Sequence, residues 1–199
     1  MRGDFVRGPV DVWAPQISDL LRSVGHIAYV AGGAARELVM RDVAPPAWDI
    51  DLFMFDGADV GLCKEMLFGM GYRQDAYTEH SSQFHPPEPE TQLAVQVIEH
   101  FENEWSLTTG EPEDVLSHFS FTTEMFAVVA RSEGFEAVVG VRAPEDTRSR
   151  MLKVQNVTDP LIVSLRAVKY GYKGYGISEE EMQKVFDEYV VRSRVPVCP

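Results

Sequence analysis

Cysteine is scarce in this chain of 199 residues, and its scarcity excludes two kinds of site. Cys63 and Cys198 are the only two cysteines, and they form no Cys-x-x-Cys pair. This excludes a disulfide framework and a zinc site built on paired cysteines. No apolar run reaches the length of about 18 residues that a membrane span needs, and the first residues, MRGDFVRGPVDVW, lack the apolar block of a secretory signal. These absences predict a cytoplasmic protein without a membrane partner.

Positive charge is also scarce, and it is unevenly placed. The net charge is −13, and residues 1–140 hold 8 basic and 23 acidic side chains, whereas residues 141–199 hold 10 and 8. Phosphate backbones need clustered cations, so this balance argues against a general nucleic-acid binder. Any anionic partner is expected at the C-terminal third or in a local pocket, and the remaining acidity serves solubility.

The pattern of apolar residues predicts a mixed α/β fold with a small β-sheet and a helical C-terminal segment. Helices are expected over 15–24, 34–41, 58–69 and 112–118, and two more around the Gly-rich turn near residue 174. Strands are expected at HIAYVA, WDIDLFMF and TQLAVQVIEHF. A loop or an irregular hairpin is expected over 72–91, and a loop at APEDTRSR, residues 143–150. The five histidines show no metal-ligand spacing.

Residues 29–55, YVAGGAARELVMRDVAPPAWDIDLFMF, form the most informative segment. It reads as a strand, a Gly-Gly turn, a helix, and a second strand. Gly32 and Gly33 let the backbone approach a ligand, and the helix they open presents N–H groups to an anion. Arg36 can reach the same anion with a forked donor. The segment therefore predicts an anion site beside the Gly-Gly turn.

Asp49 and Asp51 alternate along the second of these strands, so both carboxylates project from one face. Two hard oxygen ligands on one face suit Mg²⁺ and the phosphates that it bridges. Two such ions could stabilise the attacking and leaving oxygens of an in-line displacement. Taken singly, a Gly-Gly turn or an Asp-x-Asp pair is commonly a plain turn or a strand end. Their combination, in this order, indicates phosphoryl-type transfer.

The segment resembles the head domain of class II CCA-adding enzymes and bacterial poly(A) polymerases, in the polymerase-β nucleotidyltransferase superfamily. Their pattern of Gly-Gly-x-x-Arg-Asp followed by Asp-x-Asp stands here as Gly32–Glu37 and Asp49–Asp51. Three later stretches fit the same order. The following core strand of the family resembles LAVQVIEHF, and its Arg-Arg-Asp-Phe-Thr motif resembles HFSFTTEMFAV. The start of its helical neck resembles DPLIVSLRAVKYGYKGYGI. The resemblance implies a head-like domain over 1–158 and a neck-like segment over 159–199.

The chain departs from the family pattern at several positions. Ser120 stands within His118–Thr122, where the family has Arg-Arg-Asp-Phe-Thr, and Glu37 replaces the aspartate after Arg36. The acidic position on the next strand falls at Gln96, although Glu99 could substitute from the strand end. The nucleotide-selecting helix of the family has no clear match. The resemblance thus implies a short stand-alone head, similar to proteins encoded in bacteriophage genomes. A phage-encoded protein would work in the cytoplasm of the host. The resemblance does not extend to CCA addition.

Two further groups of residues leave alternatives open. Arg166 and Lys169 lie one turn apart on the expected neck helix, so they could face a triphosphate or simply carry surface charge. Tyr170, Tyr172 and Tyr175, with nearby lysines, could stack on a base or could pack in the core.

The resulting hypothesis is a Mg²⁺-dependent nucleotidyltransferase that moves a nucleoside monophosphate from a nucleoside triphosphate such as ATP to an acceptor hydroxyl. The resemblance favours an RNA 3′ end as the acceptor, with a protein or a small molecule left open. Asp49 and Asp51 would hold the metals. Gly32, Gly33, Arg36, Arg166 and Lys169 would hold the nucleotide, and Gln96 or Glu99 would line the acceptor side. The alternative is a degenerate member that binds a nucleotide or a protein partner without catalysis.

Overall fold

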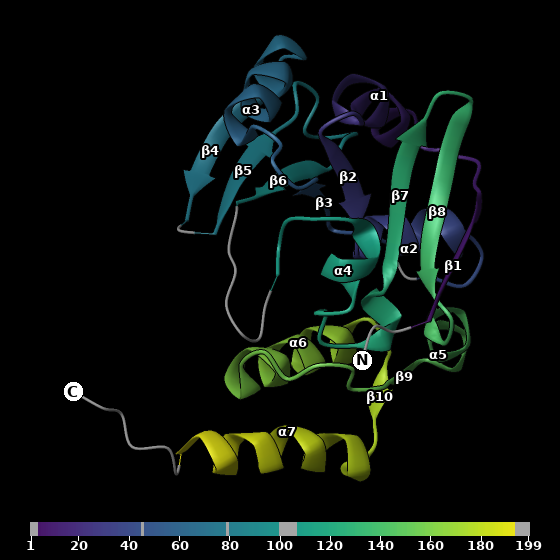
Figure 1. The fold of residues 1–199 in the computed structure, drawn as a ribbon, viewed down its shortest axis with the longest axis vertical. Coiled ribbons are helices and arrows are strands. Elements are labelled where there is room, and N and C mark those ends of the chain that lie inside the picture. The colour runs from purple at the N-terminus through teal and green to yellow at the C-terminus, as the bar shows by residue number, and fades with distance from the viewer. Residues whose placement is uncertain (1–3, 45, 79, 100–106, 194–199) are drawn as a thin grey trace.

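A computed structural model describes residues 4–44, 46–78, 80–99 and 107–193 and contains a large mixed sheet flanked by helices (Figure 1). The order in the main sheet is β1-β8-β7-β2-β3-β6-β5-β4, and a second sheet pairs β10 with β9. The strands are β1 Phe5–Pro9, β2 Ala28–Ala31, β3 Asp49–Met54, β4 Arg73–Tyr77, β5 Ser81–His85, β6 Ala94–Ile98, β7 Phe126–Arg131, β8 Gly134–Gly140, β9 Met151–Leu152 and β10 Gly176–Ile177. The helices are α1 Pro15–Val24, α2 Gly33–Val39, α3 Val60–Gly69, α4 Pro112–Leu116, η1 Thr122–Glu124, α5 Ala143–Ser149, α6 Pro160–Tyr172 and α7 Glu179–Ser193.

The centre of the main sheet consists of β2 and β3, which pair antiparallel, and of β6, which runs parallel to β3. All four residues of β2 are buried, as expected for an apolar strand that is covered on both faces. β3 pairs on both edges, and its backbone is therefore held along its whole length. This strand carries the acidic pair, so the pair stands on one of the most constrained segments of the fold.

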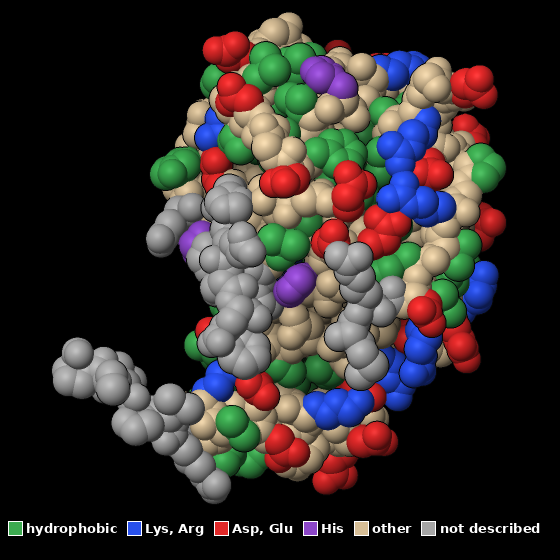
Figure 2. Space-filling model, in the orientation of Figure 1, with side chains coloured by type: hydrophobic (Ala, Val, Ile, Leu, Met, Phe, Trp, Pro, Cys, Tyr) green, Lys and Arg blue, Asp and Glu red, His purple; other side chains and the backbone are tan. Residues whose placement is uncertain are grey.

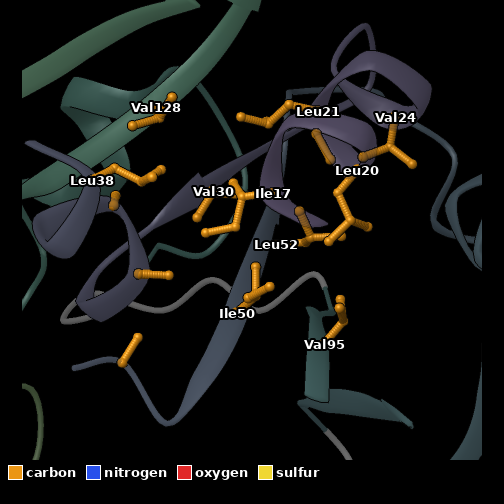
Figure 3. Packing of buried hydrophobic residues seen from close by; sticks show 14 of the residues in the cluster. Ile17, Leu20, Leu21, Val24, Val30, Leu38, Ile50, Leu52, Val95 and Val128 are labelled. Carbon is orange, nitrogen blue, oxygen red and sulfur yellow. The ribbon is translucent and has the colours of Figure 1, made fainter. Parts of the chain in front are cut away.

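One face of the sheet is covered by α1, α2 and α3. Ile17, Leu20, Leu21 and Val24 of α1 recur at helical spacing and pack on Val30, Ile50, Leu52 and Val95 of the central strands (Figure 3). Pro15 opens α1 as its first residue, where a missing N–H costs nothing. The opposite face packs a second cluster around Tyr29, Phe53 and Leu116.

The C-terminal helices share a third cluster with the rest of the chain. Phe121 and Leu152 come from the first 158 residues, and Val163, Tyr170 and Val185 come from α6 and α7. Asp59 and Asp159 cap α3 and α6 in the same way, each accepting from the two N–H groups that follow the first residue of its helix. The two segments predicted as 1–158 and 159–199 are therefore joined by one continuous group of buried side chains.

The outer side of α6 is apolar and open. Leu161, Leu165, Val168 and Tyr172 follow one another at spacings of four, three and four residues, and each is more than half exposed. Val163 and Tyr170 lie on the opposite, buried side. Arg166 and Lys169 of α6 lie between these two sides and are exposed.

The sequence predicted most of these elements but was wrong about the size of the sheet and about APEDTRSR. The sheet is large rather than small, because β1 adds to the edge of β8 and the hairpin β4–β5 extends the other edge. This hairpin, with a register shift between Gln74 and Ala76, confirms one of the two alternatives expected for residues 72–91. APEDTRSR is a helix rather than a loop. Its proline in the first turn and its early Glu145 and Asp146 are favourable signals for a helix start. Cys63 is buried in the core, while Cys198 and His100 lie outside the described residues.

Acidic side chains are spread over the visible face, and Lys and Arg gather along one edge and near the end that holds α6 and α7 (Figure 2). This spread agrees with the interpretation of the acidity as a solvated surface. Within the described ranges, none of the helices combines the length and the hydropathy that a bilayer crossing requires.

Candidate functional site

Asp49 and Asp51 stand at the start of β3 and project from one face of the sheet, because side chains two residues apart in a strand point the same way. Both are half-buried, while Ile50 between them is fully buried in the core on the other face. Pairing of β3 with β6 holds the backbone of both residues, and Asp51 also pairs with Ala31 of β2. The strand thus presents two carboxylates side by side at the sheet surface.

Gln96 is the residue that the structure brings to this pair. It lies opposite Asp51 in the parallel register of β3 and β6, so its side chain shares the face of the carboxylates. Its Nε2 donates to Ser81 Oγ on β5 across 2.7 Å. Among the described residues, no three His, Cys, Asp or Glu side chains lie close enough to share a metal ion. The position next to the pair is therefore held by a neutral amide.

Glu99 does not join the pair, contrary to the expectation that it could substitute for Gln96. It lies three residues after Gln96, and an odd separation along extended chain directs its side chain to the opposite face. There its Oε1 lies 2.6 Å from Lys64 Nζ and accepts a hydrogen bond from Ser82 Oγ at 2.8 Å. Glu99 is occupied in an ion pair under α3.

The Gly-Gly turn lies directly beside Asp51. Gly32 has a φ of +73°, a conformation that L side chains rarely adopt. A Cβ built on Gly32 would lie 3.7 Å from Asp51 Oδ2 and 3.8 Å from Phe119 Cε2. Gly33 follows as the first residue of α2. The absence of a side chain at Gly32 therefore leaves room next to the carboxylate.

Arg36 is placed differently from the sequence-based expectation, which had it reaching toward a bound anion. Its side chain is fully buried, because α2 packs against η1 and because Tyr170 of α6 covers the guanidinium. Its Nη1 donates to Thr123 O at 3.0 Å and to Tyr170 Oη at 2.9 Å. Nε and Nη2 have no hydrogen-bond acceptor among the described residues. Arg36 thus connects α2 to α6 beneath the Gly-Gly turn and is closed off from solvent.

Arg166 and Lys169 of α6 are close enough to the acidic pair for their charges to act on Asp51. Arg166 Nη1 donates to the buried Ser120 Oγ at 3.0 Å and lies 4.0 Å from Glu124 Oε2. The positive charges of Arg166 and Lys169 both act on Asp51 and oppose the rise in its pKa. Two cations from the C-terminal segment therefore lie near the carboxylates, and one of them, Arg166, is hydrogen-bonded to Ser120.

The acidic pair fits a hard divalent cation. Burial, reinforced by the negative charge of Asp49, raises the pKa of Asp51 to about 7. Two carboxylates with no cation between them repel each other, and a divalent metal held by both would remove that cost. Asp49 and Asp51 would hold such a metal, which supplies charge neutralisation of bound phosphate.

Two residues near the pair were missed or only loosely grouped by the sequence. Trp48 directly precedes Asp49, and its ring carries Lys169 Nζ at 5.2 Å and Lys173 Nζ at 4.3 Å from its centroid. Burial lowers the pKa of Lys173, and Asp49 and Asp51 oppose this shift. A tryptophan placed directly before Asp-x-Asp was the signal that could have identified this group.

The sequence left open whether the tyrosines stack on a base or pack in the core, and the structure separates buried from exposed ones. Tyr170 and Tyr175 are buried, lie edge to face with ring centroids 5.3 Å apart, and flank the Arg36 guanidinium. Tyr172 is 85% exposed on the outer side of α6. The first two tyrosines therefore have a packing role, in agreement with the second of those readings.

Comparison with solved structures places this arrangement in a known fold. A Thermotoga maritima CCA-adding enzyme complexed with tRNA matches at a TM-score of 0.65 and 15% identity, over 92% of this chain and 46% of its own. A structure titled tRNA-processing enzyme matches at 0.61 and 17%, over 96% and 51%. A CCA-adding enzyme with CTP matches at 0.64 and 17%, over 90% and 45%.

The chain has the nucleotidyltransferase fold. The head-domain resemblance that the sequence suggested is thus confirmed at the level of fold. The present chain spans about half the length of the chains in these structures. No protein-family model matches it, and no curated protein sequence does either.

Proposed function

We propose that the chain is a Mg²⁺-dependent nucleotidyltransferase. The observation that carries this function is the position of Asp49 and Asp51 on one face of β3, with the positive charges of Lys169 and Arg166 acting on Asp51. Carboxylates that hold a metal and cations that neutralise phosphate are the two parts that phosphoryl-type transfer needs from a protein. The nucleotidyltransferase fold adds support, because two of the similar structures are titled as complexes with CTP and with ATP.

The reaction is the displacement of pyrophosphate from a nucleoside triphosphate. The oxygen of an acceptor hydroxyl forms a bond to the α-phosphorus, the bond from that phosphorus to the bridging oxygen breaks, and the hydroxyl proton passes to solvent. Asp49 and Asp51 hold the metal, and Arg166 and Lys169 bind the triphosphate. The open backbone at Gly32 leaves room for a phosphate oxygen. Gln96 lies on the same face and lines the acceptor side.

An RNA 3′ hydroxyl is the acceptor that we propose. Two of the similar structures are titled as complexes with tRNA or a primer tRNA. The less acidic C-terminal third, with the cations of α6, is the part of the chain that suits a phosphate backbone.

Calorimetry tests the site. We expect ATP or another nucleoside triphosphate to bind in the presence of Mg²⁺, and binding to be lost in an Asp49→Ala/Asp51→Ala variant. Asp42→Ala/Asp56→Ala is the matched control, because it removes the same charge from two exposed positions. Incubation with labelled triphosphates and short RNAs then tests transfer. Equal triphosphate binding by both double variants would refute the function.

Gln96 favours a second candidate, a nucleotide-binding protein without transfer activity. A neutral amide stands where a third carboxylate would orient the metal, and it is engaged with Ser81. Loss of one metal-orienting group can cost several kcal/mol of barrier, on the order of 10²-fold or more in rate. Tight Mg²⁺-dependent triphosphate binding, without product from any RNA, protein or small-molecule acceptor, would favour this candidate.

A further inference from the structure

Trp48 is a large aromatic side chain held open at the edge of the candidate site. It is 54% exposed, although it directly precedes the half-buried Asp49 at the start of β3. Single exposed apolar residues are common and need no special role. The surroundings of Trp48 are what distinguish it, because its ring contacts Lys169, one of the cations that border the acidic pair, and Lys173, on which both carboxylates act.

Two ammonium groups approach the Trp48 ring from α6. Lys169 Nζ lies 5.2 Å and Lys173 Nζ 4.3 Å from the ring centroid, both within the range of a cation–π contact. Lys169 also acts on Asp51, and the charges of Asp49 and Asp51 act on Lys173. The two ammonium groups therefore contact the indole on one side and act on the nearby carboxylates on the other.

We propose that Trp48 is the platform on which the base of the nucleoside triphosphate stacks. A nucleotide joins an aromatic base to a polyanion, and this surface offers an aromatic ring and cations in direct contact with each other. When a nucleotide binds, the side chains of Lys169 and Lys173 would leave the indole and contact the phosphates. This movement would expose the face of the ring to the base. Trp48 can have this role only if the chain binds a nucleoside triphosphate, so the inference rests on the function proposed above.

Stacking sets a particular specificity. Every base has a π-face, so a stacking platform accepts all four bases and favours those with larger rings. We therefore expect ATP and GTP to bind more tightly than CTP and UTP, with no base rejected outright. The family's base-selecting helix has no clear match in this sequence, and Trp48 supplies the base contact in its place.

The test compares nucleotides with a polyphosphate that has no base. Mg²⁺-dependent binding of ATP, CTP and inorganic tripolyphosphate is measured by calorimetry on the wild type, Trp48→Ala and Trp48→Phe. We expect Trp48→Ala to weaken ATP binding by about fivefold or more, since base stacking on aromatic side chains contributes at least about that much, and to leave tripolyphosphate binding unchanged. Trp48→Phe should retain part of the ATP preference.

Trp13→Ala is the matched control. Trp13 is also exposed, at 36%, and also carries a cation, with the Arg41 guanidinium 4.7 Å from its ring centroid. It lies just before α1, where it lines a separate pocket of about 500 Å³ with α1 and α2. We expect Trp13→Ala to bind ATP and tripolyphosphate as the wild type does.

Three results would overturn the role of Trp48. Equal affinity of the wild type for ATP and tripolyphosphate would show that the base makes no contact. Equal weakening of both ligands in Trp48→Ala would show that the indole only positions Lys169 and Lys173. Loss of binding to a short single-stranded RNA, with ATP binding intact, would assign the ring to the acceptor. If not even tripolyphosphate binds with Mg²⁺, the proposed function itself fails.

Discussion

Asp51 and Gln96 lie opposite each other in the parallel register of β3 and β6, and Gln96 donates its amide hydrogen to Ser81 on the next strand. A carboxylate at position 96 could keep this contact, because the Ser81 hydroxyl can donate instead of accepting. The pair and its neighbour therefore form a three-residue face in which only the third member lacks charge.

Gln96→Glu should strengthen Mg²⁺ binding by on the order of tenfold, because it adds a third anionic oxygen ligand. Calorimetry with MgCl₂ measures this change, and Glu99→Gln is the control. Since Glu99 is engaged with Lys64 and Ser82, its neutralisation should leave Mg²⁺ affinity unchanged. Unchanged Mg²⁺ binding in Gln96→Glu would mean that position 96 does not face the metal.

The raised pKa of Asp51 gives a pH dependence of stability. Burial, reinforced by Asp49, raises this pKa to about 7, whereas an aspartate in the unfolded chain titrates near about 3.9. Between these values the folded protein binds the extra proton, so the contribution of Asp51 to stability is present at low pH and is lost as the pH rises through about 7.

Asp51→Asn removes this dependence. Its melting temperature should exceed that of the wild type by more at pH 8 than at pH 5, without added metal. Differential scanning calorimetry in matched buffers checks the comparison, and Asp56→Asn, at an exposed position, controls for net charge. A constant difference across the two pH values would contradict the raised pKa.

Gly32→Ala should be costly in two separable ways. The φ of +73° at Gly32 opposes any Cβ, at a cost of roughly 1–2 kcal/mol in the free energy of unfolding. Gly57 has a φ of +69° with nothing within 4 Å of a built Cβ, so Gly57→Ala isolates the cost of backbone strain. We expect similar destabilisation in urea for both variants and weaker Mg²⁺-triphosphate binding for Gly32→Ala alone.

Tyr170→Phe should destabilise the fold through Arg36. The substitution removes an acceptor from a fully buried guanidinium, which costs about 1–3 kcal/mol in the free energy of unfolding. Tyr172→Phe, two residues on and 85% exposed, should cost almost nothing. Urea denaturation of both variants measures the difference, and equal stability would show that the Arg36–Tyr170 contact adds nothing.

The sequence predicted what depends on local pattern. Helix α1 begins and ends where its apolar spacing and its proline indicate, and Asp49 and Asp51 share a face because strands alternate. Gln96 could be aligned with the acidic pair because it lies in a strongly apolar strand. These predictions needed only the period of the element and the identity of its residues.

The sequence could not predict what depends on contacts between distant segments. Arg36 was predicted to bind an anion, but it is buried because α6, more than a hundred residues later, supplies Tyr170. Glu99 was considered as a substitute ligand, but Lys64 of α3 engages it. The edge strand β1 was missed because its residues form a strand only by pairing with β8.

The burial of Arg36 beneath α6 has a consequence for motion. A hinge that swung α6 away from the sheet would remove the Tyr170 acceptor and the Tyr170 ring from the guanidinium. It would also open the cluster that contains Phe121 and Val163. Breaking so many contacts at once opposes such a hinge. Access to the candidate site is then controlled by long side chains, chiefly those of Lys169 and Lys173. Their rotamers exchange far faster than helices move.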